Sequence, residues 1–90
     1  MSEPKFPLGR LLATPNALAQ IPPPEITEAL GRHHSGDWGS LCQEDKEAND
    51  AALNQGARLL SAYHTRSGTK FWIITEADRS ATTVLLPEDY

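Results

Sequence analysis

Several carboxylates of this sequence have the chemistry to act as a general acid and base, or to bind Mg²⁺ through their oxygens. Asp45 is the most informative of them, because it lies beside the apolar face expected for the longest helix, one turn before Asn49. A carboxylate in that place needs a partner, and Arg58 or Arg79 could bind it through two hydrogen bonds. Structural networks of this kind outnumber catalytic pairs, so we expect a network that holds the helix on the sheet. The other carboxylates considered are Asp37, Glu44 and Glu76.

The histidines and the single cysteine match no spacing of a zinc or nucleophile site. His33 and His34 are adjacent, so they point in different directions on a helix. We expect these two imidazoles to stabilise a helix end through its dipole, and Cys42 to be a buried packing residue. The sequence contains no Gly-x-Ser-x-Gly elbow and no glycine-rich phosphate loop. We therefore expect no metal and no cofactor.

Trp38 and Trp72 are large apolar side chains with one hydrogen-bond donor each. In a chain of this size we expect both in the core. An exposed tryptophan would instead mark a binding surface, because tryptophan is enriched among the residues that dominate interface energies. The sequence leaves both possibilities open.

Length and charge restrict the functions open to this chain. Its 90 residues form one domain, and a domain this short buries little surface, which makes a homodimer plausible. The net charge of −4 comes from residues 1–56, and an acidic excess disfavours direct binding to nucleic acid. No apolar run is long enough to span a membrane, and no secretory signal is evident. With one cysteine, we expect a cytoplasmic protein.

The N-terminal part is expected to begin with a flexible lead at 1–7 and a short strand at 8–14. Thr14 followed by Pro15 is typical of a helix start, because threonine caps the first free amides and proline tolerates the first helical position. This helix should run to Gln20, and the prolines that follow should end it.

Two further helices are expected at 25–34 and 41–55, the second closed by Gly56 in a left-handed conformation. The longer of them has only a narrow apolar stripe, so it should lie close to whatever it packs on. The stripe consists of Leu41, Ala48, Ala52 and Gln55. Residues 8–90 are predicted to form a single domain.

The C-terminal part has the pattern of a three-stranded antiparallel β-meander. Aromatic and β-branched residues are concentrated at 58–65, 70–76 and 81–86, with short turns between these runs. The central run, Phe71-Trp72-Ile73-Ile74, is apolar on both faces, so either both faces are covered or one face binds a partner. We predict an α+β fold in which a short N-terminal strand and two to three helices pack on this meander, with four strands if the N-terminal one joins it.

A series of short motifs runs from position 36 to the end of the chain. They are Gly36-Asp37-Trp38-Gly39, Glu44-Asp45, Asn49, Ala52-Leu53, Arg58-Leu59-Leu60-Ser61-Ala62-Tyr63, Trp72-Ile73-Ile74-Thr75-Glu76-Ala77-Asp78-Arg79-Ser80, Thr82-Thr83 and Leu85-Leu86-Pro87. Over about residues 8–90 the chain resembles a group of short uncharacterised bacterial proteins labelled plasmid-related. The resemblance implies an accessory protein of a mobile genetic element, and it places any site where Asp45 and Asn49 meet the turn at 75–80. The polar signature of the group falls on Asp37, Glu44, Asp45, Asn49, Tyr63, Glu76, Asp78 and Arg79.

Two main classes of function follow. The acidic helical part, the doubly apolar strand and the missing catalytic constellation favour a non-enzymatic interaction protein, which binds a host or element-encoded protein through an acidic or apolar surface. A host nuclease or a toxin would be such a partner. The alternative is a small metal-dependent hydrolase or nuclease that uses Asp45, Glu76 and Asp78. A third hypothesis, nucleic-acid binding by the hairpin, requires four basic residues to share one face: Arg58, Arg66, Lys70 and Arg79.

Overall fold

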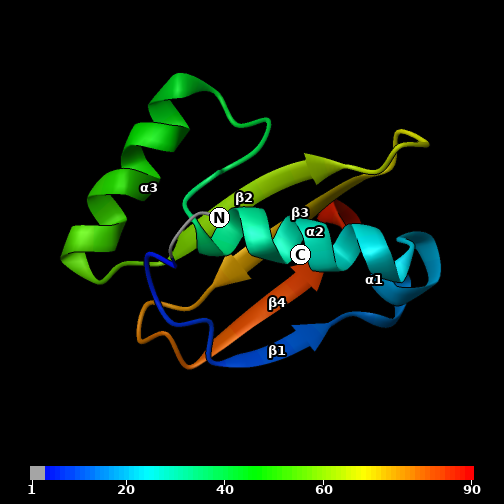
Figure 1. Ribbon diagram of the computed structural model, residues 1–90, viewed down its shortest axis with the longest axis horizontal. Coiled ribbons are helices and arrows are strands. Elements are labelled where there is room, and N and C mark those ends of the chain that lie inside the picture. The colour runs from blue at the N-terminus through cyan, green and yellow to red at the C-terminus, as the bar shows by residue number, and fades with distance from the viewer. Residues whose placement is uncertain (1–3) are drawn as a thin grey trace.

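One mixed sheet organises the fold, with its strands in the order β1-β4-β3-β2 (Figure 1). The structure is a computed structural model, and it describes residues 4–90. The elements in chain order are β1 (Arg10–Ala13), α1 (Pro15–Gln20), α2 (Pro23–His34), α3 (Gln43–Gln55), β2 (Leu59–His64), β3 (Lys70–Thr75), β4 (Ala81–Leu85) and the 3₁₀ turn η1 (Pro87–Asp89).

The predicted α+β fold is confirmed, and so is the antiparallel meander of β2, β3 and β4. The N-terminal strand joins the sheet as a fourth strand, because β1 pairs with β4 in parallel from Arg10 opposite Ala81 onward. A parallel neighbour requires a long connection, and here the three helices and two strands between β1 and β4 provide it. The sheet therefore brings the first and last strands of the chain side by side.

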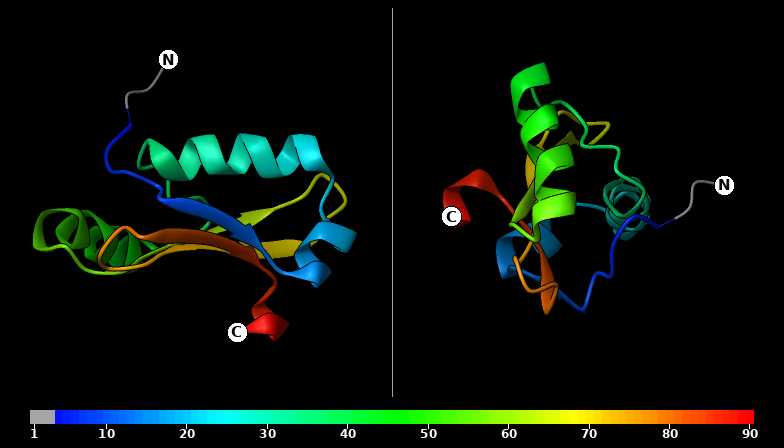
Figure 2. Two further views of the ribbon diagram at one scale, coloured as in Figure 1. Left: turned by 90° about the horizontal axis from the view of Figure 1, so that it is seen from below. Right: turned by 90° about the vertical axis from the view of Figure 1, so that its left-hand side faces the viewer.

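The first two helices begin at prolines. The Thr14 side chain accepts a hydrogen bond from the Ala17 amide, which confirms the predicted cap of α1. The next helix, α2, begins at Pro23 rather than at 25, because a proline in the first turn forfeits no helical hydrogen bond. Figure 2 shows α2 lying along one face of the sheet.

The α3 helix packs differently from the prediction. It ends at Gly56 with φ +67°, as expected, but Ala48 and Gln55 of the predicted stripe are exposed. Ala52 of the stripe is buried as predicted, and the other buried position of the helix is Asn49, which was predicted to lie beside the stripe. The reason is that α3 lies beside the sheet, next to the edge strand β2, and does not cover a sheet face (Figures 1 and 2). Cys42 precedes this helix and is exposed, so the expectation of a buried cysteine was wrong.

Two clusters of buried side chains form the core. The larger lies between α2 and the sheet and is centred on Phe71 and Ile73. The smaller joins the N-terminal segment to α3 through Phe6, Trp38 and Ala52. Phe6 belongs to the segment predicted as a flexible lead, yet its side chain is only 7% exposed. Packing therefore begins before β1, while residues 1–3 of that lead lie outside the described part of the chain.

The two faces of β3 are covered to different extents. Ile73 faces α2 and is fully buried. On the opposite face the C-terminal turn η1 folds back, and the Tyr90 ring packs edge-on against Trp72 with 5.8 Å between ring centres. Arg58 donates a hydrogen bond of 3.0 Å to the Tyr90 hydroxyl. Trp72 stays half-buried, so this second face has a thin covering in place of a second helical layer.

None of the helices within residues 4–90 combines the length and the hydropathy needed to cross a membrane.

Candidate functional site

A chain of hydrogen bonds runs through the interior between α2 and the sheet. His33 of α2 bonds through Nδ1 to the Ser61 hydroxyl at 2.5 Å and through Nε2 to the Thr75 hydroxyl at 2.8 Å. Thr75 contacts the Thr82 hydroxyl at 2.8 Å, and Thr82 donates to the carbonyl oxygen of Leu8 at 2.7 Å. These bonds tie α2 and the N-terminal segment to all three strands of the meander.

The carbonyl at the end of this chain sets the direction of every bond. Because a carbonyl only accepts, the Thr82 hydroxyl donates to it and must accept from the Thr75 hydroxyl. The Thr75 oxygen then accepts from His33 Nε2–H. Because the lowered pKa of His33 keeps the ring neutral near pH 7, Nδ1 carries no proton and accepts from Ser61. The His33 ring is therefore the neutral Nε2–H tautomer.

Burial explains why His33 stays neutral. The side chain has no exposed surface, and the rings of Phe6 and Trp38 pack edge-on against it. Removal from water, together with the nearby charges of His34 and Arg79, lowers the pKa of His33 from 6.5 to about 4. The expectation that this histidine would be a charged end of the helix, favoured by its dipole, was therefore wrong.

The Ser61–His33 pair has the residue types of an activated nucleophile, but no substrate can reach it. Both side chains are 0% exposed. The Ser61 hydroxyl is enclosed between the sheet and α2, so no carbonyl can approach within reacting distance of its oxygen. The pair serves to satisfy buried polar atoms, and no buried side-chain nitrogen or oxygen within residues 4–90 lacks a partner.

The three carboxylates of the hydrolase hypothesis share no hydrogen-bond or ion-pair partner within the described part of the chain. Asp45 is exposed on α3. Glu76 lies 3.7 Å from the Arg58 guanidinium, and Asp78 accepts a hydrogen bond from the Ser80 amide at 3.0 Å. Hydrogen bonds from Ser80 hold the pKa of the Asp78 carboxyl below its ordinary value. Across residues 4–90, no three His, Cys, Asp or Glu side chains form a group that could hold a metal ion.

Arg79 joins the end of α3 to the β3–β4 turn. Its Nη1 donates to the carbonyl of Ala57 at 2.6 Å and to that of Glu76 at 3.1 Å, and its Nη2 donates to Ala52 at 3.3 Å. The expected contact between α3 and this turn is thus present, but the Arg79 side chain forms it and Asp45 does not contribute. Carbonyl oxygens at a helix end lack helical partners, so a guanidinium satisfies several of them at once.

Asp37, Trp38 and Tyr63 fix the loop before α3. Asp37 accepts hydrogen bonds of 2.8 and 3.3 Å from Arg32, which hold the pKa of its carboxyl below the ordinary value. The Tyr63 hydroxyl donates to the Asp37 carbonyl at 2.6 Å, and burial raises the pKa of Tyr63. Trp38 is 3% exposed and donates to Asp50 at 3.0 Å, so it belongs to the core.

These loop contacts close the outer edge of β2. The Ser40 amide donates to the Ala62 carbonyl at 2.8 Å, and the Ala62 amide donates to the Trp38 carbonyl at 3.2 Å. Two residues earlier on β2, the Asn49 side chain donates to the Leu60 carbonyl at 2.6 Å and accepts from its amide at 3.2 Å. Asn49 therefore occupies both backbone groups that a neighbouring strand would use.

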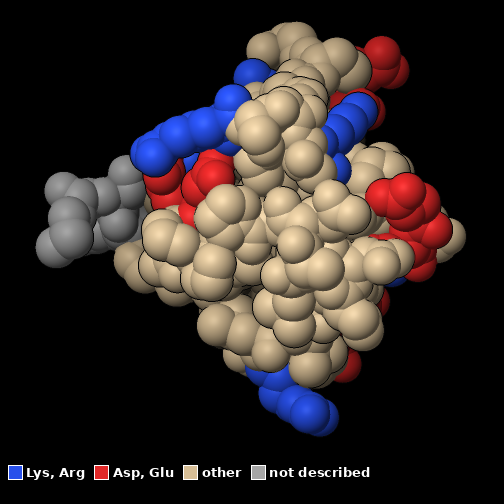
Figure 3. All heavy atoms as spheres, turned by 90° about the vertical axis from the view of Figure 1, so that its right-hand side faces the viewer, with Lys and Arg blue, Asp and Glu red and all other residues tan. Residues whose placement is uncertain are grey.

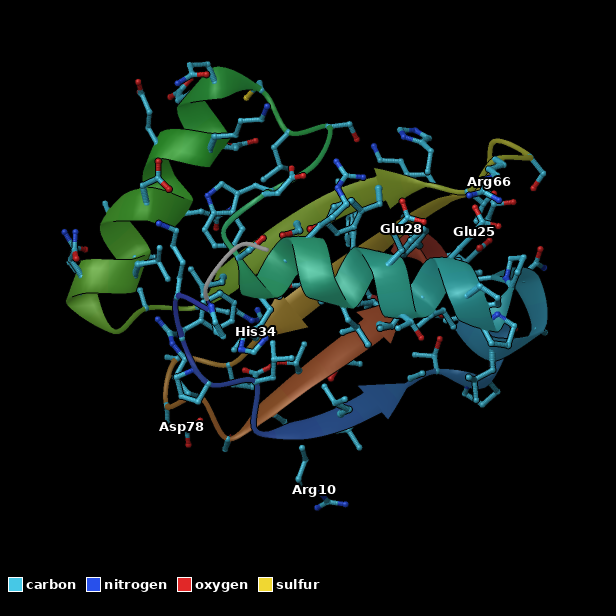
Figure 4. All side chains as sticks on the ribbon, viewed as in Figure 1. Arg10, Glu25, Glu28, His34, Arg66 and Asp78 are labelled. Carbon is cyan, nitrogen blue, oxygen red and sulfur yellow. The ribbon has the colours of Figure 1, made fainter. Side chains whose placement is uncertain are left out.

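A shallow charged cleft lies between α2 and the β2–β3 turn. Figure 4 shows Glu25 and Glu28 of α2 beside Arg66 of the turn. Glu25 accepts a hydrogen bond of 2.8 Å from the Arg66 amide. The cleft has a volume of about 90 Å³, and both acidic and basic side chains line it. It is too small for a substrate of ordinary size, since ligand pockets usually measure roughly 300 Å³ or more.

The end of the molecule that carries β1 and α1 differs from the charged cleft in having a long stretch of chain without charged side chains. No charged residue lies between Arg10 and Glu25, and we call residues 11–24 the uncharged end. Leu11, Leu12 and Leu18 are 57%, 42% and 62% exposed there. Figure 3 looks onto this end and shows a broad surface without charge, with acidic and basic side chains around its margin.

The β1 strand forms the open edge of the sheet. The Arg10 amide donates to the Ser80 carbonyl and the Thr14 amide to the Val84 carbonyl, at 3.0 Å each. Alternate residues of a strand direct their backbone groups to opposite sides, so those of Leu11 and Ala13 point away from β4. No hydrogen bond from another segment of residues 4–90 reaches them. The two edges of the sheet thus differ, with Leu60 and Ala62 of β2 covered and β1 open.

Comparisons with known proteins give no relative, because no family model, curated protein or solved structure matches this chain. The resemblance to plasmid-related proteins therefore stays a prediction. The uncharged end was not among the predicted sites, because those sites were chosen for charged and hydrogen-bonding residues. The signal that could have found it is the absence of charge from residues 11–24.

Proposed function

We propose that this chain is a small interaction protein that binds a protein partner through its uncharged end. The observation that carries the proposal is the exposure of Leu11, Leu12 and Leu18 on a surface without charge. Interface cores are depleted of charged residues, and exposed apolar patches of small proteins commonly mark binding sites. In the mobile-element context that the sequence resemblance implies, the partner is a host protein or a protein of the element.

The charge distribution supports this choice over the acidic surface considered from the sequence. The chain carries a net charge of −4, yet the uncharged end contributes nothing to it. Burial of this surface would remove no ion from water and would leave the charged cleft and α3 solvated. An apolar surface is therefore the less costly one to bury, since desolvation of charges opposes association.

Site-specific photocrosslinking tests the proposal. A photoreactive amino acid at Leu18 should give a crosslinked protein in cells, whereas the same group at Ala51, exposed on α3, should not. With the identified partner purified, Leu18→Glu should raise Kd roughly tenfold or more, because it places a charge in the interface. Ala51→Glu is the matched control and should leave Kd unchanged. Equal adducts from both positions would refute the proposal.

A further inference from the structure

The open edge of β1 has the chemistry to accept another strand. The backbone groups of Leu11 and Ala13 point outward, and both side chains of the Leu11-Leu12 pair are exposed. Exposed edge strands with free backbone groups are the usual sites of strand addition. The ligand chemistry at this edge is therefore an extended, largely uncharged peptide segment.

We propose that this segment is β1 of a second copy of the chain, paired antiparallel so that Leu11 lies opposite Ala13 of the other copy. The inference rests on the proposed function, because it names an occupant for one side of the uncharged end. In this register each copy uses the outward amides and carbonyls of Leu11 and Ala13, and Leu12 faces Leu12 of the other copy. The product is a continuous sheet with four strands from each copy and both α2 helices on one face.

Charge complementarity favours a second copy as the occupant. Arg10 and Thr14 lie on the same face of β1 as Leu12, and Figure 4 shows the Arg10 side chain pointing away from the molecule. The Thr14 hydroxyl donates to the Asp89 carboxylate at 2.7 Å. Since the register places Arg10 opposite Thr14 of the other copy, each Arg10 meets the other copy's Asp89. Because the dimer is two-fold symmetric, this ion pair forms twice, once on each side of the axis.

The Asp89 carboxylate is prepared for this role by its existing contacts. Besides Thr14, it accepts hydrogen bonds from the Asn16 side chain at 2.7 Å and from the Leu86 amide at 3.1 Å. These donors hold the pKa of Asp89 below its ordinary value, so it is ionised at neutral pH. A shift of two residues in one direction would place Arg10 opposite Leu12 and lose both ion pairs. The same shift in the other direction would place Leu11 opposite Pro15, which has no N–H to donate. Charge and backbone chemistry together therefore select one register.

A disulfide across the two-fold axis tests the register. Leu12 faces its own copy in a non-hydrogen-bonded pair, with Cα atoms roughly 4.5 Å apart, a separation that a disulfide can bridge. In a Cys42→Ser background, Leu12→Cys should form a covalent dimer in a glutathione redox buffer. Leu18→Cys is the matched control, because Leu18 is more exposed than Leu12 and lies outside the strand. Crosslinking at position 18 as fast as at position 12 would overturn the proposal.

Sedimentation of the full chain tests the dimer itself. The native protein should sediment as a dimer of the 9.9 kDa chain in the micromolar range. Arg10→Glu should raise the dimer Kd roughly tenfold, because it replaces two attractive pairs with two repulsive ones, whereas Arg10→Lys should stay near native. A monomeric native chain would overturn the dimer, and an unchanged Kd in Arg10→Glu would overturn the register.

The outcome separates this inference from the proposed function. A native chain that is monomeric but still crosslinks through position 18 to a different protein would refute the second copy alone. A dimer whose position 18 gives no more adducts than position 51 would refute the different partner alone.

Discussion

The neutral, buried His33 makes the stability of this protein depend on pH. Its pKa is about 4 in the folded state against 6.5 ordinarily, so on acidification the unfolded chain takes up the proton first. The contribution of His33 is complete above pH 6.5, falls as the pH drops through that value, and levels off below the folded pKa. The total loss is about 3 kcal/mol, of which about 2 kcal/mol is lost between roughly pH 8 and pH 5.

Urea unfolding, followed by tryptophan fluorescence, measures this loss. The upper part of the pH range isolates His33, because depressed carboxyls such as Asp37 change protonation only below the ordinary value of 3.8. His33→Gln should abolish the slope, whereas His64→Asn, at an exposed position of β2, should leave it intact. If His33→Gln is too unstable, imidazole NMR of the native protein should show a neutral Nε2–H ring at about pH 5. A flat native profile, or a His33 ring that titrates near 6.5, would refute the reasoning.

Three further predictions concern single positions. Asn49→Leu should cost about 1–3 kcal/mol in urea unfolding, because two backbone groups of β2 lose their partner, whereas exposed Asn54→Ala should cost less than about 0.5 kcal/mol. Arg79→Gly should cost roughly 1 kcal/mol less than Arg79→Ala, since the backbone there has φ +60°; equal costs would contradict this. Gly31→Ala should stabilise α2 by about 1 kcal/mol in thermal unfolding, because the added Cβ meets open space. In Gly39→Ala the added Cβ would overlap the Ala62 carbonyl oxygen, so circular dichroism of that variant should show an unfolded chain.

Local chemistry made much of the fold predictable. The Thr14-Pro15 cap, the left-handed Gly56 and the turns of the meander each depend on neighbouring residues, so their sequence patterns are sufficient. From the sequence alone, the N-terminal strand could either join the meander or stay outside it, because its pairing with β4 depends on residues far apart in the chain. The meander was thus predictable in detail, and its fourth strand was not.

The interior network and the edge contacts lay beyond sequence reasoning for the same reason. His33 is buried because Ser61 and Thr75, distant in sequence, supply its hydrogen bonds. Asn49 broke the expectation of an apolar helix stripe, since α3 packs against backbone groups of an edge strand, which favour an amide over a methyl group. Arg79 was singled out for its charge, but its four hydrogen bonds all go to carbonyl oxygens.

The closed edge of β2 limits how large an assembly this chain can build. A sheet with two free edges can add copies without end and grow into a fibre, because each addition exposes a new edge. Here Asn49 and the loop around Gly39 occupy the outward backbone groups of Leu60 and Ala62, so within the described residues β1 offers the more accessible edge for strand addition. Growth of the sheet beyond two copies is therefore disfavoured. Asn49→Ala would free the backbone groups of Leu60 on that side, while the loop contacts to Ala62 would still cover the rest of the edge.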